Sequence, residues 1–379
     1  MADRESDVIA KIASGVSGLN SSAWDRLAGC DPFVSHAFLS ALEDSKSVGP
    51  GTGWTAAPIL VEDDGSHLVA AAPAYLKSHS QGEYVFDHGW AEAWQQAGGD
   101  YYPKLQVAVP FTPVPGPRLL GFRSQQLLAA IEAVVTQNAM SSAHITFIDN
   151  DALSECERRS WLIRTGVQYH WFNRGYGSFD DFLGALSSRK RKTLRKERAA
   201  ASEGLTFRKL RGVEIGRSEW DAMWTFYQET GSRKWGRPYL TRAFFDLVGE
   251  RMRDQVLLML AYRGSLPIAG ALNFVGPDTL YGRYWGAVED VPFLHFELCY
   301  YQAVEWAIAH GLSSVQAGAQ GEHKIARGYE PVITHSAHFI PNRGFRAAVA
   351  EFLEAERAGI AAEVEWLRQD LPYRSSASE

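Results

Sequence analysis

Few of the features that mark secreted, membrane-spanning or zinc-binding proteins occur in this sequence. Its three cysteines are an odd number without C-x-x-C spacing, which argues against a disulfide framework and against a zinc site. The first 15 residues lack the basic start and apolar core of a secretory signal. No later run approaches the roughly 18 to 20 apolar residues that a membrane span needs. We therefore expect a cytoplasmic protein.

The usual catalytic signatures are missing as well. The histidines show no H-E-x-x-H or comparable ligand spacing, so no metal site is predicted. The chain also contains no G-x-S-x-G, no P-loop and no dinucleotide-binding G-x-G-x-x-G. Hydrolase, kinase and dehydrogenase hypotheses therefore lose their usual support. Cys299 lies among aromatic residues, which favours a packed core thiol over a nucleophile.

Charge is unevenly distributed along the chain. The formal net charge is -6, but residues 187–200 hold seven Lys or Arg and one Glu, a local +6 that leaves -12 for the remainder. This segment is open to interpretation as a solvated helix, a nucleic-acid patch, or a docking site for coenzyme A, an acyl carrier protein, tRNA or lipid headgroups. No aromatic residue is interleaved, so base stacking is not expected and DNA is not a predicted partner. The anionic-donor interpretation is favoured, with peripheral contact at the inner membrane through 187–200.

The length and apolar content predict two domains. A chain of 379 residues with 46% hydrophobic content can bury two separate cores. In the first half we expect strands at 55–62, 67–76, 83–87, 105–109 and 144–149, with a helix at 123–138. In the second half we expect strands at 255–262, 267–275, 279–286 and 313–318, with a helix at 293–310 that Gly311 caps. This repeated order suggests a tandem duplication of one α/β unit.

The same pattern sets the expected domain boundaries. We place an N-terminal domain at 1–165 and a C-terminal domain at 166–344. The segment between the repeats contains a predicted helix around 219–230. Residues 345–379 form a closing helix and tail, because apolar residues follow one stripe with glutamates around it.

Two polar segments concentrate residues suited to chemistry. The first, residues 77–90, holds Lys77, His79 and Glu83 in a strand-and-turn context. The second is the expected helix at 293–310, where Glu297, Tyr301 and Glu305 recur every four residues and share one face. Such a face is often solvated. Glu297 is flanked by apolar residues, however, so its carboxylate needs a partner, either His295 or an arginine.

A third polar segment follows the last strand of the second repeat. It contains Glu322, His323, Lys324 and Arg327 behind Gly318 and Gly321. Successive amides of such a glycine turn can cradle an anion, although an ordinary charged turn has the same composition. A histidine beside a glutamate is suited to removing a proton from an ammonium or a hydroxyl near neutral pH.

Six segments together resemble the FemAB-like N-acyltransferases of the GNAT superfamily, a family described as acting in peptidoglycan biosynthesis or recognition. They are KSHSQGEYVFDHGW, YYPKLQVAVPFTPV, SSRKRKTLRKERAA, GRYWG, HFELCYYQ and GAQGEHKIARGYEP. The resemblance runs from Asp31 to Pro372. It implies an α/β (α+β) fold of two tandem GNAT-like domains with mixed, mainly antiparallel sheets, and a site in the cleft between them. The pyrophosphate motif Q/R-x-x-G-x-G/A of simple acetyltransferases is missing before Phe293, so their mode of binding acetyl-CoA is not expected here.

The resemblance also implies acyl transfer to an amine. The donor would be acyl-CoA or an acyl carrier protein, acting as co-substrate without a tightly bound cofactor. Some similar proteins are bacterial ceramide synthases, so a sphingoid base giving a (dihydro)ceramide is the first acceptor. One alternative is an aminoacyl-tRNA-dependent transferase acting on a peptidoglycan precursor. Another is a non-enzymatic binding protein on the same fold.

Residue roles follow from this hypothesis. An amine is mostly protonated at pH 7, so a base must act first. We assign that role to His295 oriented by Glu297, or to His323 beside Glu322. The predicted residues that bind substrate or stabilise the oxyanion are Lys77, His79, Glu83, Arg283, Tyr300, Tyr301, Lys324 and Arg327.

Overall fold

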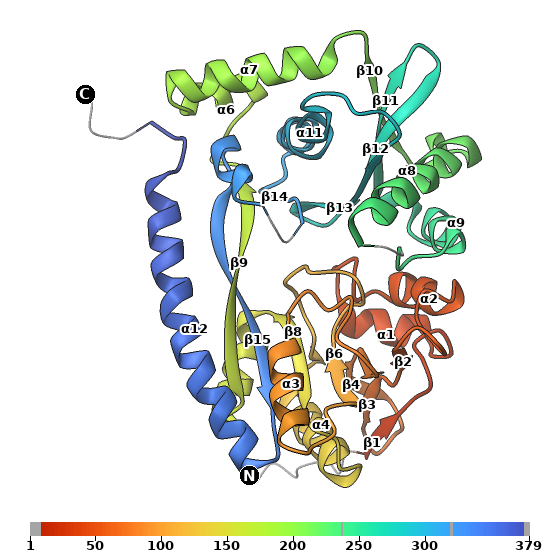
Figure 1. Cartoon of the computed structure of the whole chain (residues 1–379). Helices are drawn as coiled ribbons and strands as arrows, with labels where there is room; N and C mark the ends of the chain where they lie inside the picture. The colour runs from red at the N-terminus through yellow and green to blue at the C-terminus, as the bar shows by residue number, and fades with distance from the viewer. Residues whose placement is uncertain (1–8, 236–237, 319–320, 375–379) are drawn as a thin grey trace, which may run out of the picture. The chain divides into compact units, whose positions relative to one another are not determined.

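The computed structural model describes residues 9–235, 238–318 and 321–374, and the chain divides into two compact units (Figure 1). Unit 1 comprises residues 1–166 and 334–361, and unit 2 comprises residues 167–333 and 362–379. The first division lies one residue from the boundary expected at 165. Residues 334–361 belong to unit 1, so the chain enters each unit twice.

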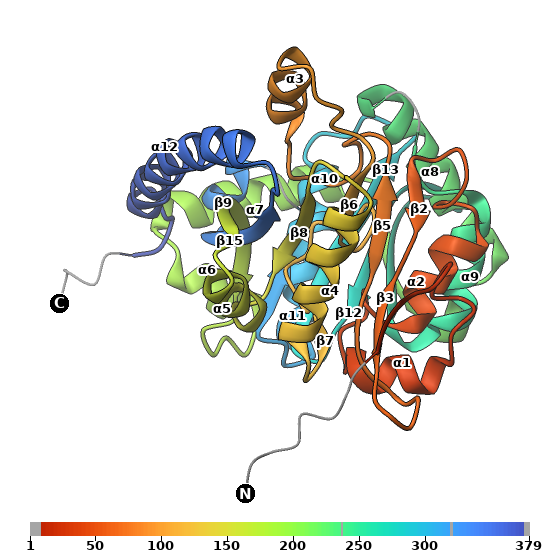
Figure 2. The same cartoon turned by 90° about the horizontal axis from the view of Figure 1, so that it is seen from below.

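Unit 1 contains the expected helix and parts of the expected strands among a larger set of elements. They are β1 (Ile9–Ile12), α1 (Ser21–Ala28), α2 (His36–Asp44), β2 (Trp54–Ala56), β3 (Ile59–Glu62), β4 (Leu68–Ala72), β5 (Ala74–Lys77), α3 (His88–Gln96), β6 (Lys104–Val107), β7 (Leu120–Gly121), α4 (Ser124–Gln137), β8 (Ala143–Ile148), α5 (Asn150–Arg158), the start of β9 (Leu162–Phe172), most of β15 (Glu330–Phe339) and much of α12 (Arg343–Gln369). A small sheet has the order β1-β3-β4-β7. The main sheet has the order β2-β5-β6-β8-β15, and only β6 and β8 are parallel. Helix α4 covers one face of the main sheet (Figure 2).

Three strand predictions in this unit are wrong in detail. The segments 55–62 and 67–76 are each broken in two, at Pro58 and Pro73, and their halves join different sheets. Proline cannot donate a hydrogen bond to the strand ladder, so each run ends there. Residues 83–87 form a loop instead of a strand, because Tyr84 adopts a left-handed conformation with φ of 60° that interrupts extended backbone.

Unit 2 is built around the predicted meander. Its elements are α6 (Phe179–Ala185), α7 (Ser188–Ser202), β10 (Thr206–Arg211), η1 (Gly212–Glu214), α8 (Arg217–Trp235), α9 (Arg242–Arg251), η2 (Arg253–Gln255), β11 (Val256–Arg263), β12 (Leu266–Val275), β13 (Thr279–Ala287), α10 (Leu294–Phe296), η3 (Glu297–Tyr301), α11 (Gln302–Ala309), β14 (Ser314–Gln316) and η4 (Glu322–Arg327). The sheet order is β10-β11-β12-β13-β14-β9, with β13 and β14 parallel. Figure 1 shows α11 and α8 on opposite sides of β12 and β13. All of β11 except Arg263 is buried, which explains its continuous apolar sequence.

The two main sheets repeat one pairing pattern. In each unit an antiparallel pair, β5–β6 or β12–β13, is followed by a parallel pair, β6–β8 or β13–β14. A helix connects the parallel strands in both cases, α4 in unit 1 and α11 in unit 2. The expected class, α/β with mixed and mainly antiparallel sheets, is confirmed, and so is the repeated order. Across the described ranges, no helix combines the length and apolar character needed to cross a membrane.

Two local features of unit 2 shape its candidate site. Strands β13 and β14 pair only from Thr279–Ser314 to Tyr281–Gln316 and then separate, which leaves a wedge between them. The predicted helix at 293–310 is confirmed, but it contains a π-helical turn, η3, that was not predicted. Such turns often occur at functional sites. Gly311 follows α11 with φ of 67°, as expected for a C-terminal cap.

Candidate active site

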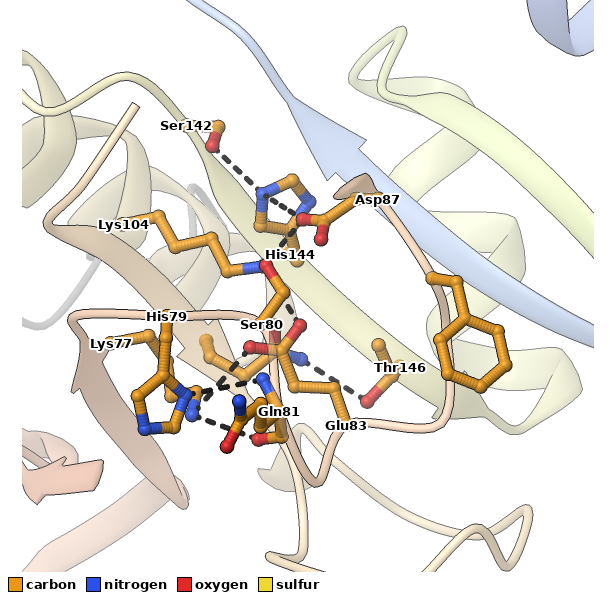
Figure 3. A network of polar contacts seen from close by, with 12 residues as sticks. Lys77, His79, Ser80, Gln81, Glu83, Asp87, Lys104, Ser142, His144 and Thr146 are labelled. Carbon is orange, nitrogen blue, oxygen red and sulfur yellow. Dashed lines mark hydrogen bonds and ion pairs between the residues drawn. The ribbon is translucent and has the colours of Figure 1, made fainter. Parts of the chain in front are cut away.

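A buried network of charged side chains lies in unit 1, on β5, β6 and the loop after β5 (Figure 3). Lys77 and Lys104 are directly opposite each other in the β5–β6 ladder, an arrangement that two like charges destabilise unless they are compensated. Glu83 supplies one counter-charge, 2.8 Å from Lys104 Nζ and 3.7 Å from Lys77 Nζ. Asp87 also binds Lys104. All four side chains are at most 3% exposed.

The environment divides these four groups into two fixed charges and two that titrate near neutral pH. Burial lowers the pKa of Lys77 to about 7 and raises the pKa of Glu83 to about 7. Burial opposes the ionised forms of the other two as well, but their attraction raises the pKa of Lys104 and holds the pKa of Asp87 below its ordinary value. Lys77 and Glu83 are therefore suited to exchanging a proton at physiological pH.

Two buried carboxylate oxygens of this network accept no hydrogen bond from any described residue. They are Asp87 Oδ1 and Glu83 Oε1, and the second has only the ion pair with Lys77 at 3.7 Å. Most buried polar atoms in proteins have a partner, so such exceptions are typical of ligand sites. An ammonium or hydroxyl group would provide the missing donors.

Two neutral histidines extend the network. His144 Nδ1 lies 2.6 Å from His338 Nδ1, and Ser142 Oγ lies 2.8 Å from His144 Nε2. Burial lowers the pKa of His144 to about 3 and also lowers that of His338. The ring of Trp90 packs 4.9 Å from the His338 ring. Lys104, His144 and His338 were missed by sequence analysis, because only strand register brings them beside Asp87.

His79, a predicted substrate-binding residue, has a different environment. Its Nε2 lies 3.0 Å from the Thr52 carbonyl oxygen, and its Nδ1 accepts from the Gln81 amide at 3.2 Å. These contacts fix the loop that carries Glu83. The structure therefore brings Lys77 and Glu83 together, while the imidazole of His79 binds backbone groups.

An apolar groove of about 550 Å³ lies in the same unit, between α3 and α12. Aromatic rings dominate its lining, which consists of Phe86, Gly89, Trp90, Ala93, Trp94, Ala97, Asn342, Gly344, Phe345, Ala348, Val349 and Phe352. Phe86 is 52% exposed and Phe352 is 48% exposed. Sequence analysis missed α3, although Trp90 and Trp94 have the i, i+4 spacing of one helix face.

In unit 2, the predicted face of Glu297, Tyr301 and Glu305 packs against helix α7; Glu297 and Tyr301 are buried there, and the Glu305 side chain is 37% exposed. Arg198 binds Glu297 at 2.9 Å and Glu305 at 3.5 Å, so the arginine among the expected partners is Arg198. Gln302 also donates to Glu297, at 2.7 Å. These contacts, rather than a bond to His295, hold the Glu297 carboxylate. Part of the basic segment is thus used to position this helix.

Tyr301 and Arg327 meet on the same side of unit 2. Both bind Glu197 of α7, Arg327 at 2.9 Å, and Arg327 Nε donates to the Tyr301 hydroxyl at 3.1 Å. Burial raises the pKa of Tyr301 far above its ordinary value, so this phenol stays protonated. The pair is a preformed polar group that connects α7, η3 and η4.

The two histidines proposed as bases lie next to each other. The ring centroids of His295 and His323 are 6.4 Å apart, and Tyr300 Oη lies 2.9 Å from His323 Nε2. Glu322 and His323 are exposed, and Arg327 donates to the His323 carbonyl at 2.7 Å. Two histidines that are 28 positions apart in the sequence are thus brought close together.

A small cavity of about 130 Å³ occupies the wedge between β13 and β14. It is lined by Ala271, Leu272, Asn273, Gly282, Arg283, Tyr284, Trp285, His295, Cys299, Ala317 and Gly318. Lys324 Nζ donates to the Gly318 carbonyl at 2.7 Å, and burial lowers the pKa of Lys324 to about 7. Cys299 packs against the hydrophobic core of unit 2, as expected, but it is only half-buried and also lines this cavity. Among the described residues, no three His, Cys, Asp or Glu side chains are grouped to hold a metal ion.

Comparison with known proteins identifies the fold and then the family. FemX shares the fold, with a TM-score of 0.54 and 12% identity over 91% of this chain and 100% of FemX. A conserved protein of unknown function from Bacteroides thetaiotaomicron VPI-5482 matches with a TM-score of 0.50 and 8% identity, over 87% of this chain and 99% of that one. A tandem GNAT protein from the clavulanic acid biosynthesis pathway matches at a TM-score of 0.46 and 12% identity, over 89% and 99%.

The chain belongs to the FemAB-like family, described as peptidoglycan biosynthesis/recognition, whose model matches residues 15–375. No curated protein matches the chain significantly. The resemblance inferred from the sequence is therefore confirmed. Family and fold together support a transferase of acyl or aminoacyl groups.

Proposed function

We propose that this protein is an N-acyltransferase that moves an acyl group from a thioester, acyl-CoA or acyl carrier protein, to the amine of a long-chain amino alcohol. A sphingoid base is the first acceptor, and the product is a (dihydro)ceramide. The observation that carries the proposal is the apolar groove between α3 and α12.

The groove has the size and lining for an alkyl chain. Its volume of about 550 Å³ lies within the roughly 300–1,000 Å³ typical of small-molecule sites. Each methylene buried there contributes about 0.8 kcal/mol. A sugar nucleotide or a peptide stem would instead place polar groups against Phe86, Trp94 and Phe352. Exposure of these rings to water is unfavourable in free energy, and a bound lipid tail would cover them.

Polar groups suited to the amino head lie on the same loop as the groove. Phe86 lines the groove, while its neighbours Glu83 and Asp87 hold buried oxygens without donors. These oxygens would accept bonds from the ammonium and hydroxyl of an amino alcohol. Lys77, with its pKa near 7, would compensate the added positive charge by releasing a proton.

The proposed roles in unit 2 concern the acyl donor. Lys324 and Arg327 would stabilise the developing oxyanion, and Arg283, Tyr300 and Tyr301 would bind substrate. His295 or His323 remains the proposed general base, since both lie beside the phenol of Tyr300. Glu322 is exposed, so its proposed role is limited to the electrostatic effect of its negative charge on His323.

A second candidate function is aminoacyl transfer from tRNA to a peptidoglycan precursor. The family description and the fold shared with FemX favour it. Helix α7 would serve it as well, because Arg189, Lys192 and Lys196 are exposed on this helix. In that case ribonuclease would abolish activity in an assay supplied with charged tRNA.

A thiol-release assay tests the first proposal. Purified protein is given acyl-CoAs of several chain lengths with a panel of amines that includes sphinganine, and free CoA is measured with a thiol-reactive dye. We expect release that depends on a long-chain amine and resists ribonuclease. Release that requires RNA, or no release with any amine, would contradict the proposal.

A pair of variants on α12 tests whether the groove binds the substrate. Phe352→Asp places a charge in the groove, whereas Trp366→Asp changes an aromatic side chain of the same helix that is 62% exposed and does not line it. Burying a phenylalanine contributes about 1.5–3 kcal/mol, so the first variant should raise KM for sphinganine roughly tenfold or more. A short amine should be unaffected. Equal effects of both variants on KM would show that the groove does not bind the substrate.

A further inference from the structure

The three thiols of the chain differ in their surroundings. Cys30 is exposed, Cys156 is buried, and burial raises the pKa of Cys156 to about 12. Cys299 is partly exposed and lines the wedge cavity of unit 2. It is therefore the thiol that a small reactant entering this cavity would meet.

The backbone around Cys299 departs from a regular helix. Cys299 lies in the π-helical turn η3, between the short α10 and the longer α11. His295 is four residues earlier and lines the same cavity, so an imidazole and a thiol face one space. A π-turn in this position is typical of helices adapted to function.

A buried amine adjoins the same cavity. Lys324 is 1% exposed, and its Nζ donates to the carbonyl oxygen of Gly318, which lines the cavity. Burial lowers the pKa of Lys324 to about 7, and electrostatic attraction by Cys299 opposes this drop. The thiol lines this cavity and the amine binds a backbone group that lines it, and near neutral pH a large share of the amine can accept a proton.

The cavity also holds an acceptor without a donor. Asn273 is fully buried and lines the cavity, and its Nδ2 donates to the carbonyl oxygens of Leu257 and Ala271. Those two bonds fix the orientation of the amide. Its Oδ1 accepts nothing from the described residues. A ligand with an N–H group would satisfy it, and the amide-containing arm that carries an acyl thioester has such groups.

We propose that Cys299 receives the acyl group from the donor thioester and carries it covalently before the amine takes it. This inference rests on the proposed N-acyltransferase function. In the first step the Cys299 proton passes to Lys324, the thiolate attacks the donor carbonyl, and the bond from that carbonyl to the donor sulfur breaks. The donor leaves as a thiol with the proton that Lys324 returns.

In the second step the amine attacks the acyl-Cys299 carbonyl. A carbon–nitrogen bond forms and the bond to the Cys299 sulfur breaks. The cysteine thiol is restored with a proton from the amine. No oxidant or reductant is required, because one thioester is exchanged for another and then for an amide.

Acyl loading without an acceptor tests the inference. The full chain is mixed with palmitoyl-CoA alone, quenched in acid, and examined by intact mass and peptide mapping. We expect one acyl group per chain on Cys299, removable by hydroxylamine, and a burst of one equivalent of CoA. Cys299→Ala should lose both the adduct and the burst, while Cys30→Ser should retain them. Lys324→Met should slow loading at least tenfold.

The outcomes separate this inference from the function on which it rests. Steady thiol release with sphinganine, but no adduct on the wild-type chain, would refute the covalent step and leave N-acyl transfer intact. The same holds if Cys299→Ala keeps wild-type turnover. If no thiol is released under any condition, the proposed function itself fails. Peptide mapping of the wild-type chain decides the question even if the Cys299→Ala variant does not fold.

Discussion

Replacing Arg198 by methionine leaves the Glu297 carboxylate buried without its counter-charge. The Glu297 side chain is 1% exposed and receives three guanidinium hydrogen bonds, 2.9, 3.1 and 3.3 Å long. Breaking a buried pair from one side costs about 3–5 kcal/mol. Arg198 is 22% exposed, so solvent screens part of its charge and we expect the lower end, about 3 kcal/mol. Gln302 alone cannot compensate a full charge.

Urea unfolding followed by circular dichroism measures this loss. Arg195→Met is the matched control, because Arg195 lies on the same helix and its ion pair with Asp180 is exposed on both sides, at 59% and 81%. That variant should stay close to the wild type. The double variant Arg198→Met with Glu297→Gln should recover most of the stability, since it removes the buried charge as well. Equal unfolding midpoints for Arg198→Met and Arg195→Met would refute the reasoning.

Two further predictions concern pH and backbone packing. The folded protein holds the Glu83 proton up to a pKa of about 7, whereas the unfolded chain releases it near the ordinary value of 4.5. Glu83 should therefore make the free energy of unfolding fall as pH rises from 4.5 to 7, whereas His144 and His338, whose pKa values burial lowers from 6.5, act in the opposite direction below pH 6.5. Glu83→Gln removes the first contribution alone, so the profile of the variant should rise more steeply with pH than that of the wild type; an unchanged slope would contradict the assignment. At Gly286 of β13, an added Cβ would lie 1.9 Å from the backbone oxygen of Phe226. Gly286→Ala should lower stability by about 1–3 kcal/mol, whereas Gly359→Ala in α12, with open space around it, should not, and equal melting temperatures would contradict this contact.

Periodicity located most of the regular elements. The helix α4 and the strands β11, β12 and β13 were predicted because each carries an uninterrupted apolar pattern of one period. The errors lie where a single residue overrides the pattern. Pro58 and Pro73 divide apolar runs that read as one strand, and the left-handed Tyr84 turns an apparent strand into a loop. Those breaks place Glu83 and Asp87 where they meet Lys104.

The buried network of unit 1 was beyond sequence reasoning for a different reason. Lys77 and Glu83 are close in sequence and were chosen together. Lys104 reaches them through the β5–β6 register, and His338 reaches His144 through the β8–β15 register. Register depends on which strands become neighbours, and residues 194 positions apart carry no local sign of it.

The π-turn explains why the candidate residues of unit 2 were only partly assigned. Regular 3.6-residue periodicity places Glu297, Tyr301 and Glu305 on one face and gives no special position to Cys299. One wider turn at 297–301 changes the direction of the side chains that follow it relative to His295. Glu297 and Glu305 then contact Arg198, while Cys299 and His295 line the cavity between the separating strands. A thiol that packs against the core thereby also faces the cavity that His295 lines, and acyl loading on this cysteine would show that the turn serves the transfer reaction.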